Sequence, residues 1–361
     1  MAARDYPKMG QVRIWLHCLR RSVAAALLLG TYGVAQAQYI IGADIGYLKQ
    51  AQDSGKVFKE NGQPKPVLYI LREHGYNWVR LRLFVEPTER PYTLAYAIAS
   101  AKMAKAAGFK ILLDLHYSDT WADPGHQRTP AAWAKLSHDQ LCDQVFRYTR
   151  DTVAAFRDAG VLPDMVAIGN EITHGMLWPD GKLPENWSNF TDLLKSGING
   201  VDAGHGDTPR PLIMIHIDRG GDWARTKDFF DHLAAAKVRF DVIGQSYHPW
   251  WQGSLNDLRD NLYQMAVTYH KPIVLAEVSY PWEPYQKQPD AAPFPETPEG
   301  QKAWLQALNQ IVEETPEHLG AGLFWWEPAV PSGHQLTGRS YFEQNGNVLP
   351  VITVFDAFTR K

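Results

Sequence analysis

Two glutamates stand where apolar runs of the sequence end. The run "VAIGNE" ends at Glu171, and the run "VLAEV" carries Glu277. An ionised carboxylate among apolar neighbours is costly unless it is paired or hydrogen-bonded. Each glutamate therefore belongs either to a stabilising salt bridge or to a cleft in which a carboxylate has a chemical role. Paired carboxyl groups across a sugar-sized gap hydrolyse glycosidic bonds, one as the proton donor and the other as the ionised nucleophile.

Arginines and tryptophans follow the same kind of apolar run. Arg80 and Arg82 are two residues apart, so both project to one side of a strand, and a guanidinium beside Glu277 would keep that carboxylate ionised. Flat aromatic faces suit the apolar faces of sugar rings, although a single tryptophan is as readily explained by packing. Six tryptophans lie just past the ends of apolar runs, which favours a polysaccharide groove: Trp121, Trp178, Trp250, Trp251, Trp282 and Trp326.

A metal site is the main chemical alternative. His116, His216 and His248 lie on different predicted strands and could meet as zinc ligands. The sequence has neither an H-E-x-x-H motif nor a D-x-[DN]-x-[DN]-G calcium loop. Two glutamates accompanied by aromatic residues match a glycan site better than a zinc site. We therefore expect no metal and no cofactor at the catalytic centre.

The elements that must position these residues alternate in type. Eight short apolar runs, rich in β-branched residues, predict strands at 39–45, 77–83, 110–116, 165–171, 211–218, 241–248, 272–278 and 322–327. Helical patterns lie between them, and two of these stop at Gly108 and Gly160, a helix C-terminal signal. This alternation predicts a single (β/α)8 barrel. The rival, a doubly wound open sheet, usually has a glycine-rich phosphate loop after its first strand, and none follows "GADIGYL".

A barrel of this kind has its active site at the carboxyl ends of the strands. The fourth and seventh strands, which carry Glu171 and Glu277, face each other across the barrel. Polar and ionisable residues are concentrated at the predicted strand ends, whereas the strand starts carry few of them. We therefore expect both glutamates to point into one cleft.

The first 37 residues resemble a secretory leader. Arg20 and Arg21 precede an apolar stretch, and Ala35-Gln36-Ala37 has the small-x-small pattern of a cleavage site. A membrane anchor would need about 18 consecutive apolar residues, and this run is shorter. We predict a signal peptide at 1–37, a catalytic barrel at 38–361, and export to the periplasm or the extracellular space, with no membrane association after cleavage.

The charge balance limits the kind of partner. The chain has 36 lysines and arginines against 39 acidic residues, a net charge of −3. Nucleic acids and anionic membranes require a basic face, so neither is expected as a partner. A neutral polysaccharide is compatible with this composition, and the sequence gives no indication of oligomeric state.

The motifs resemble those of the glycoside hydrolase family 53 endo-β-1,4-galactanases. The matching stretches run in order from "IGADIGYLKQ" through "LLDLHYSDTWADPGHQ", "IGNEITHGMLWPDG" and "DVIGQSYHPWWQG" to "LAEVSYPW" and "GLFWWEPA". Together they span residues 40 to 350. The resemblance implies a retaining (β/α)8-barrel hydrolase that cleaves the β-1,4-galactan or arabinogalactan side chains of pectin.

The resemblance also implies roles for individual residues. Glu171 would be the acid/base and Glu277 the nucleophile, which Arg80 and Tyr247 would orient. Asn170 would bind the sugar 2-hydroxyl. The other substrate-binding residues implied are His116, Asp119, Trp121, Asp123, Asp218, His248, Trp250 and Trp326, the last as the floor of the subsite that holds the attacked sugar. Some relatives hold a structural calcium ion in their late loops, but no ligands for one are identifiable.

Three positions depart from the family pattern and concern the outer subsites. Arg219-Gly220-Gly221 follows Asp218 where an Asn-Gly is common, His248 stands where a second tyrosine is frequent, and Tyr341 lies where a tryptophan is usual. Product length and tolerance of arabinose branches depend on such residues. One alternative is thus a barrel glycosidase for another β-1,4-glycan. A second is a catalytically silent glycan-binding protein, which would have no need for both glutamates.

Overall fold

The computed structural model describes residues 38–88, 90–284 and 292–360, so the predicted signal peptide lies outside the described residues. Eight parallel strands form a closed barrel in the order β1-β12-β11-β10-β9-β6-β5-β4. The strands are β1 (Ile40–Asp44), β4 (Trp78–Leu83), β5 (Lys110–Leu115), β6 (Met165–Ile168), β9 (Leu212–Ile217), β10 (Val242–Tyr247), β11 (Ile273–Val278) and β12 (Gly320–Trp325). The predicted (β/α)8 barrel is confirmed, and only the last strand begins outside its predicted range.

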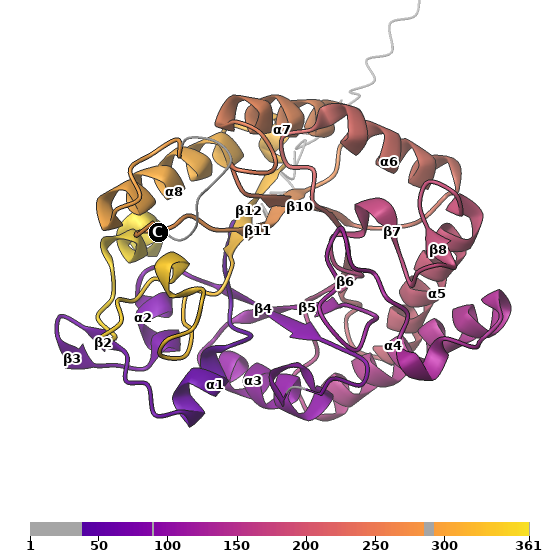
Figure 1. Ribbon diagram of the computed structural model, residues 1–361, viewed down its shortest axis with the longest axis horizontal. Helices are drawn as coiled ribbons and strands as arrows, with labels where there is room; N and C mark the ends of the chain where they lie inside the picture. Colours follow the sequence, from indigo (N-terminus) through magenta and orange to yellow (C-terminus); the bar gives the residue numbers. More distant parts are fainter. Residues whose placement is uncertain (1–37, 89, 285–291, 361) are drawn as a thin grey trace, which may run out of the picture. The chain divides into compact units, whose positions relative to one another are not determined.

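Helices surround the strands on the outside of the barrel (Figure 1). They are α1 (Leu48–Asp53), α2 (Val67–Glu73), α3 (Leu94–Ala106), α4 (His138–Asp158), α5 (Trp187–Gly204), α6 (Trp223–Ala235), α7 (Leu255–Tyr269) and α8 (Pro298–Glu313). Gly108 and Gly160 follow α3 and α4 with φ of 82° and 75°. Glycine adopts this left-handed conformation without a steric penalty, so both predicted helix ends are confirmed.

Short elements decorate the loops between strands and helices. Two-residue strands form two hairpins, β2–β3 (Lys59–Glu60 with Gln63–Pro64) and β7–β8 (Gly175–Met176 with Gly181–Lys182). The 3-10 helices are η1 (Arg90–Tyr92), η2 (Ala131–Trp133), η3 (Ile172–His174), η4 (Pro316–His318), η5 (Thr337–Arg339) and η6 (Pro350–Arg360). Of these, η3 directly follows Glu171, and η5 contributes to the cleft described below.

The inside of the barrel changes from apolar to polar along the strands. Near the strand starts, ten residues form a separate apolar cluster: Ile40, Trp78, Leu112, Met165, Ala167, Met214, Val242, Val274, Ala276 and Phe324. A side chain at Gly42 would meet the ring of Phe324 at 2.2 Å, so the filling of this layer requires glycine there. Because strand side chains alternate, Arg80 and Arg82 follow Trp78 on the inner face. The polar layer inside the barrel therefore begins directly above this apolar cluster.

Candidate active site

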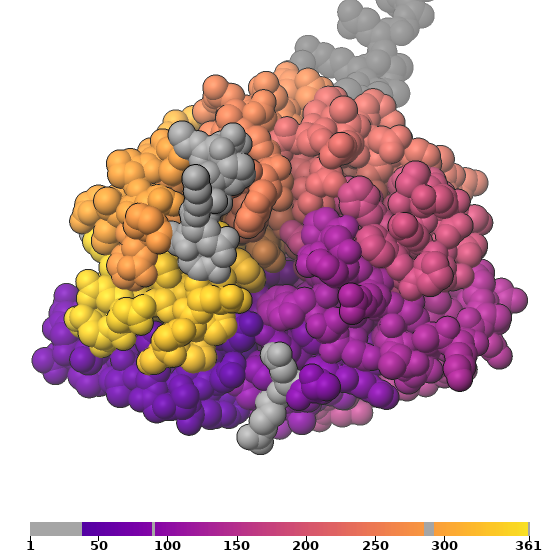
Figure 2. Space-filling view, viewed as in Figure 1, coloured from indigo at the N-terminus to yellow at the C-terminus, as the bar shows by residue number. Residues whose placement is uncertain are grey.

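A cleft of about 530 Å³ opens at the carboxyl ends of the strands. In the space-filling view the surface is hollowed between the yellow C-terminal segment and the purple and magenta loops that follow β5 and β6 (Figure 2). Its lining residues come from most strand ends: Tyr47, Trp121, Ala122, Asp123, Pro124, Asn170, Glu171, Asp218, His248, Trp251, Gln252, Glu277, Trp326, Gln335, Leu336 and Arg339. Both glutamates identified from the sequence thus lie in one cleft.

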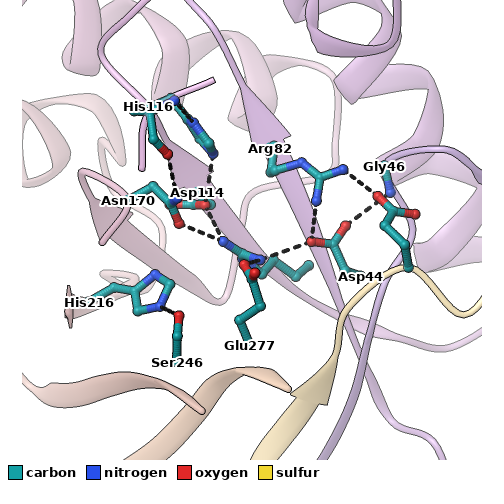
Figure 3. A network of polar contacts seen from close by, with 12 residues as sticks. Asp44, Gly46, Arg82, Asp114, His116, Asn170, His216, Ser246 and Glu277 are labelled. Carbon is teal, nitrogen blue, oxygen red and sulfur yellow. Dashed lines mark hydrogen bonds and ion pairs between the residues drawn. The ribbon is translucent and has the colours of Figure 1, made fainter. Parts of the chain in front are cut away.

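Asp44, Asp114, Asn170 and Glu277 gather in the polar layer beneath the cleft (Figure 3), and Arg80 contacts all four. Its Nη1 donates to Asp44 Oδ2 at 2.9 Å and to Glu277 Oε2 at 2.8 Å. Its Nη2 donates to Asp114 Oδ2 at 2.6 Å and to Asn170 Oδ1 at 2.7 Å. The guanidinium is 1 % exposed, so these charge-assisted bonds lie in a medium of low dielectric constant. One arginine thereby fixes residues from β1, β5, β11 and the segment after β6 relative to each other.

The surroundings of Glu277 favour its ionised form. Burial alone would raise the pKa of this carboxyl, but the nearby imidazole of His248 and the charge of Arg80 hold the pKa well below its usual range. His248 Nε2 lies 3.6 Å from Glu277 Oε1, and Ser279 Oγ lies 3.2 Å from the other ring nitrogen. One carboxylate oxygen thus faces an arginine and the other a histidine.

The surroundings of Glu171 favour its protonated form. Burial raises the pKa of this carboxyl well above its usual range, and the charges of Glu277 and Asp218 raise it further. Its backbone is left-handed, with φ of 49°, a conformation that is uncommon for residues other than glycine and is enriched at functional sites. One carboxyl group that holds a proton and one that is ionised therefore share the cleft.

The cleft brings together eight of the thirteen predicted site residues: Trp121, Asp123, Asn170, Glu171, Asp218, His248, Glu277 and Trp326. Arg80 and His116 lie below the cleft, each 1 % exposed, and His116 Nδ1 accepts from the backbone of Ala122 at 3.1 Å. Asp119 accepts from the backbone nitrogens of Glu86 and Ala131 at 3.0 and 2.8 Å. The structure therefore gives His116 and Asp119 contacts that support the loop after β5, and neither lines the cleft.

Two predicted site residues point away from the cleft. Tyr247 is fully buried and stacks over Trp304 of α8, and its hydroxyl donates to Gly253 O at 2.9 Å. The expected contact with Glu277 was wrong because alternate residues of β10 face opposite sides, so His248 meets that carboxylate instead. Trp250 is 4 % exposed and stacks on Tyr280.

The neighbouring tryptophan, not Trp250, reaches the cleft. Trp251 lines the cleft and is 59 % exposed. Sequence reasoning noted it as one of six tryptophans beyond strand ends but did not select it. Gln252, Gln335, Leu336 and Arg339 were missed, because they come from loops whose path has no periodic signal.

The third departure from the family pattern, Tyr341, does not bear on the cleft. Tyr341 is fully buried, and its hydroxyl accepts from that of Tyr76 at 2.6 Å. Its ring packs against Trp325. Among the described residues, no group of three histidine, cysteine or acidic side chains is arranged to hold a metal ion.

Comparisons with known proteins agree with this geometry. A family model described as glycosyl hydrolase family 53 matches residues 40–355. A probable arabinogalactan endo-β-1,4-galactanase A of Neosartorya fischeri is 40 % identical over 80 % of this chain and 83 % of its own length. An arabinogalactan endo-β-1,4-galactanase of Humicola insolens is 36 % identical over 87 % and 98 %. A solved fungal β-1,4-galactanase structure superposes with a TM-score of 0.82 at 35 % identity, covering 88 % of this chain and 99 % of its own.

Proposed function

Because the chain belongs to glycosyl hydrolase family 53, we propose that it is an endo-β-1,4-galactanase that acts on galactan or arabinogalactan by double displacement. The observation that carries the proposal is the pair of glutamates that share one cleft in opposite protonation states. Relatives named as arabinogalactan endo-β-1,4-galactanases support this substrate. Three tryptophans line the cleft, Trp121, Trp251 and Trp326, and several aromatic faces suit a polymer more than a single sugar.

The first half-reaction uses both carboxyl groups at once. Glu277, ionised beside Arg80, attacks the anomeric carbon, while Glu171 gives its proton to the oxygen of the departing sugar. A covalent galactosyl ester on Glu277 results. In the second half-reaction Glu171, now ionised, removes a proton from water, the water oxygen attacks the anomeric carbon, and Glu277 leaves as a carboxylate. The two carboxyl groups and water balance the reaction, so no cofactor is proposed.

Two further residues of the cleft have roles in this proposal. Asn170 Nδ2 donates one hydrogen to Ala122 O at 2.8 Å, and its second hydrogen would serve the sugar 2-hydroxyl. Trp326 lies beside His248, with ring centroids 6.1 Å apart, and would form the floor under the attacked sugar. Asn170 is also held by Arg80, so the residue that binds the sugar and the nucleophile share one support.

The place of action is part of the same proposal. The predicted leader at 1–37 supports export, and a polymeric substrate would have to be met outside the cytoplasm. Within the described ranges, no helix has the length and apolar character that crossing a membrane requires.

Product analysis on three polymers tests the proposed activity. We expect the purified chain to release galacto-oligosaccharides of mixed length from linear β-1,4-galactan and to leave β-mannan and β-glucan intact. Cleavage of another polymer would leave the roles of the two glutamates in place but would assign a different substrate. Binding of galactan without cleavage by the wild-type chain would identify a glycan-binding protein instead.

Substitution of the two glutamates tests their roles. Glu277→Gln should reduce kcat by about a thousandfold or more while galactan binding, measured by affinity electrophoresis, is retained. Glu171→Ala with an aryl β-galactobioside should be accelerated by azide and should form a β-galactosyl azide, because the covalent intermediate no longer needs a base for its breakdown. An α-azide product from Glu171→Ala would contradict double displacement.

A further inference from the structure

The turn that follows Glu171 is tied to the end of β9. Thr173, in η3, donates through its hydroxyl to Asp218 Oδ1 at 2.5 Å, and the same hydroxyl oxygen accepts from the backbone nitrogen of Asp218 at 3.2 Å. Asp218 lines the cleft beside Glu171 and is 5 % exposed. The first link between the two segments is therefore a reciprocal pair of hydrogen bonds.

Arg219 makes the second link. Its Nη1 donates to Asp218 Oδ2 at 2.6 Å, and its Nη2 donates to His174 Nε2 at 3.0 Å. The side chain is 13 % exposed and does not belong to the cleft lining. The departure from the family pattern at this position thus gives a connection between β9 and η3, not a cleft residue. We call Thr173, His174, Asp218 and Arg219 the η3 brace.

The charge states around Arg219 suit this connection. A guanidinium has only donors, so His174 must accept through Nε2 and be neutral at that nitrogen. His174 is exposed, but partial desolvation lowers its pKa, and the positive charge of Arg219 lowers it further. Asp218 supplies the opposite charge on the other side of the guanidinium. Arg219 is therefore held between an anion and a neutral acceptor, each from a different segment.

The backbone of Arg219 is itself fixed by two further elements. Its nitrogen donates to Gln245 Oε1 of β10 at 3.0 Å, and its carbonyl accepts from Asn261 Nδ2 of α7 at 2.7 Å. The next residue, Gly220, runs so close to β10 that a Cβ there would meet Ser246 O at 2.7 Å. The η3 brace thus transmits the position of β9, β10 and α7 to the turn that carries Glu171.

We propose that Arg219 is a positioning residue for proton donation by Glu171, acting through the η3 brace. The inference rests on the proposed function, in which Glu171 protonates the departing sugar oxygen. Because Glu171 stands in a left-handed conformation directly before η3, a shift of this turn redirects its carboxyl group. A misplacement of about 1 Å of a catalytic group costs on the order of a hundredfold in rate.

Leaving-group dependence separates this role from a general structural one. Galactan has a poor leaving group that needs protonation, whereas a 2,4-dinitrophenyl β-galactobioside departs without it. We expect Arg219→Gln to lower kcat/KM on galactan by about 10- to 100-fold and to change kcat/KM on the aryl glycoside less than about threefold. A merely structural defect would lower kcat/KM equally on both substrates.

The controls use a matched arginine and the other end of the brace. Arg259→Gln removes an exposed arginine of α7 whose Nη1 contacts Asn256. This variant should leave kcat/KM unchanged on both substrates. His174→Ala removes the acceptor of Arg219 and should show the same preference for the aryl glycoside, so the test survives if Arg219→Gln fails to fold. An equal loss on both substrates, or undiminished cleavage of galactan, would overturn the proposal. Failure of the wild-type chain to cleave galactan would instead overturn the proposed function. The role of Arg219 would still be testable on any glycan that the chain cleaves, by comparing kcat/KM on that glycan with kcat/KM on its aryl glycoside.

Discussion

At the scale of single residues, the two glutamates differ only in what surrounds them. Glu277 faces Arg80 and His248, and Glu171 faces two other acidic groups. Titratable groups whose environments push their pKa values apart are the usual basis of acid and nucleophile assignment. Activity should therefore persist between a low pKa, that of Glu277, and a raised pKa, that of Glu171, which gives a bell-shaped dependence of kcat/KM on pH.

Asp218→Asn tests this electrostatic account. The negative charge of Asp218 raises the pKa of Glu171, after the larger effects of burial and Glu277. Removal of this charge favours the ionised form of Glu171, so its pKa falls and the alkaline limb of the kcat/KM profile moves to lower pH. At the optimum pH we expect kcat/KM to fall by no more than roughly tenfold, because the substituted amide can still accept the hydrogen bond from Thr173.

The matched control is Asp123→Asn, at another acidic residue of the cleft, whose charge is not one of the main causes of the raised pKa of Glu171. This variant should leave the alkaline limb in place even if it lowers the rate. An alkaline limb that does not move in Asp218→Asn would mean that burial and Glu277, without Asp218, raise the pKa of Glu171. An equal shift in both variants would mean that the effect is not specific to Asp218.

Sequence reasoning was most accurate for the two glutamates, which lie together in one cleft. Glu171 and Glu277 were identified because an ionised carboxylate after a buried run needs either a salt bridge or a functional cleft, and two of them on facing strands favour the cleft. Tyr247 and Trp250 were misplaced because their direction depends on the alternation within β10 and on the turn after it. A one-residue difference in a strand reverses the side to which a side chain points, and composition alone does not settle that register.

At the scale of elements, periodic strands were predictable and short ones were not. All eight barrel strands have a continuous buried run, as parallel strands covered on both faces do. The two-residue strands of β2–β3 and β7–β8 are too short to show any period. Their positions are set by contacts with distant segments, and His74 shows how one such contact works.

His74, at the end of α2, joins the first hairpin to the C-terminal segment. Its Nε2 lies 2.8 Å from Glu60 Oε1, and its Nδ1 lies 2.5 Å from Asp356 Oδ1. Burial would lower the pKa of His74, but the hydrogen bonds to Asp356 and Glu60 raise it above its usual value. The charged imidazolium thus stabilises the junction of α2, β2 and η6.

His74→Asn should reveal a pH-dependent contribution to stability. A folded-state pKa above the unfolded value of about 6.5 gives stability that is complete below that value and is lost as pH rises through the folded-state pKa. The variant should lose roughly 1 kcal/mol at about pH 5.5, and the difference should shrink as the solution becomes alkaline. Urea unfolding at a series of pH values measures this.

His270→Asn provides the comparison, since His270 pairs with Glu317 at an exposed site. Exposed ion pairs contribute little, and asparagine tolerates the left-handed backbone there. A loss in His74→Asn that is the same at every pH would show that the side chain acts by packing and not by charge.

At the scale of the whole barrel, closure joins the two ends of the described chain. Strand β1 pairs in parallel with β12, with Ile40 opposite Gly322. Just before β1, the hydroxyl of Tyr39 donates to Asn309 Oδ1 of α8 at 2.7 Å, and its ring stacks on Phe358 of η6 at 5.4 Å. The sequence predicted the closed architecture, but it contained no sign that η6 would cover the closing seam.

Phe355, in η6, tests whether this seam controls the stability of the barrel. It is fully buried and meets the ring of Tyr76 edge-on at 5.4 Å. Phe355→Ala should lower the free energy of unfolding by about 3 kcal/mol through lost burial and a residual cavity, and thus the Tm by roughly 4 to 5 °C. Phe358→Ala, at a partly buried position of the same element, should have a smaller effect.

If closure makes the barrel one cooperative unit, circular dichroism and tryptophan fluorescence will report one coincident transition that moves as a whole in Phe355→Ala. Separation of the two signals in this variant would show that the C-terminal segment unfolds independently and that the cleft does not depend on the seam.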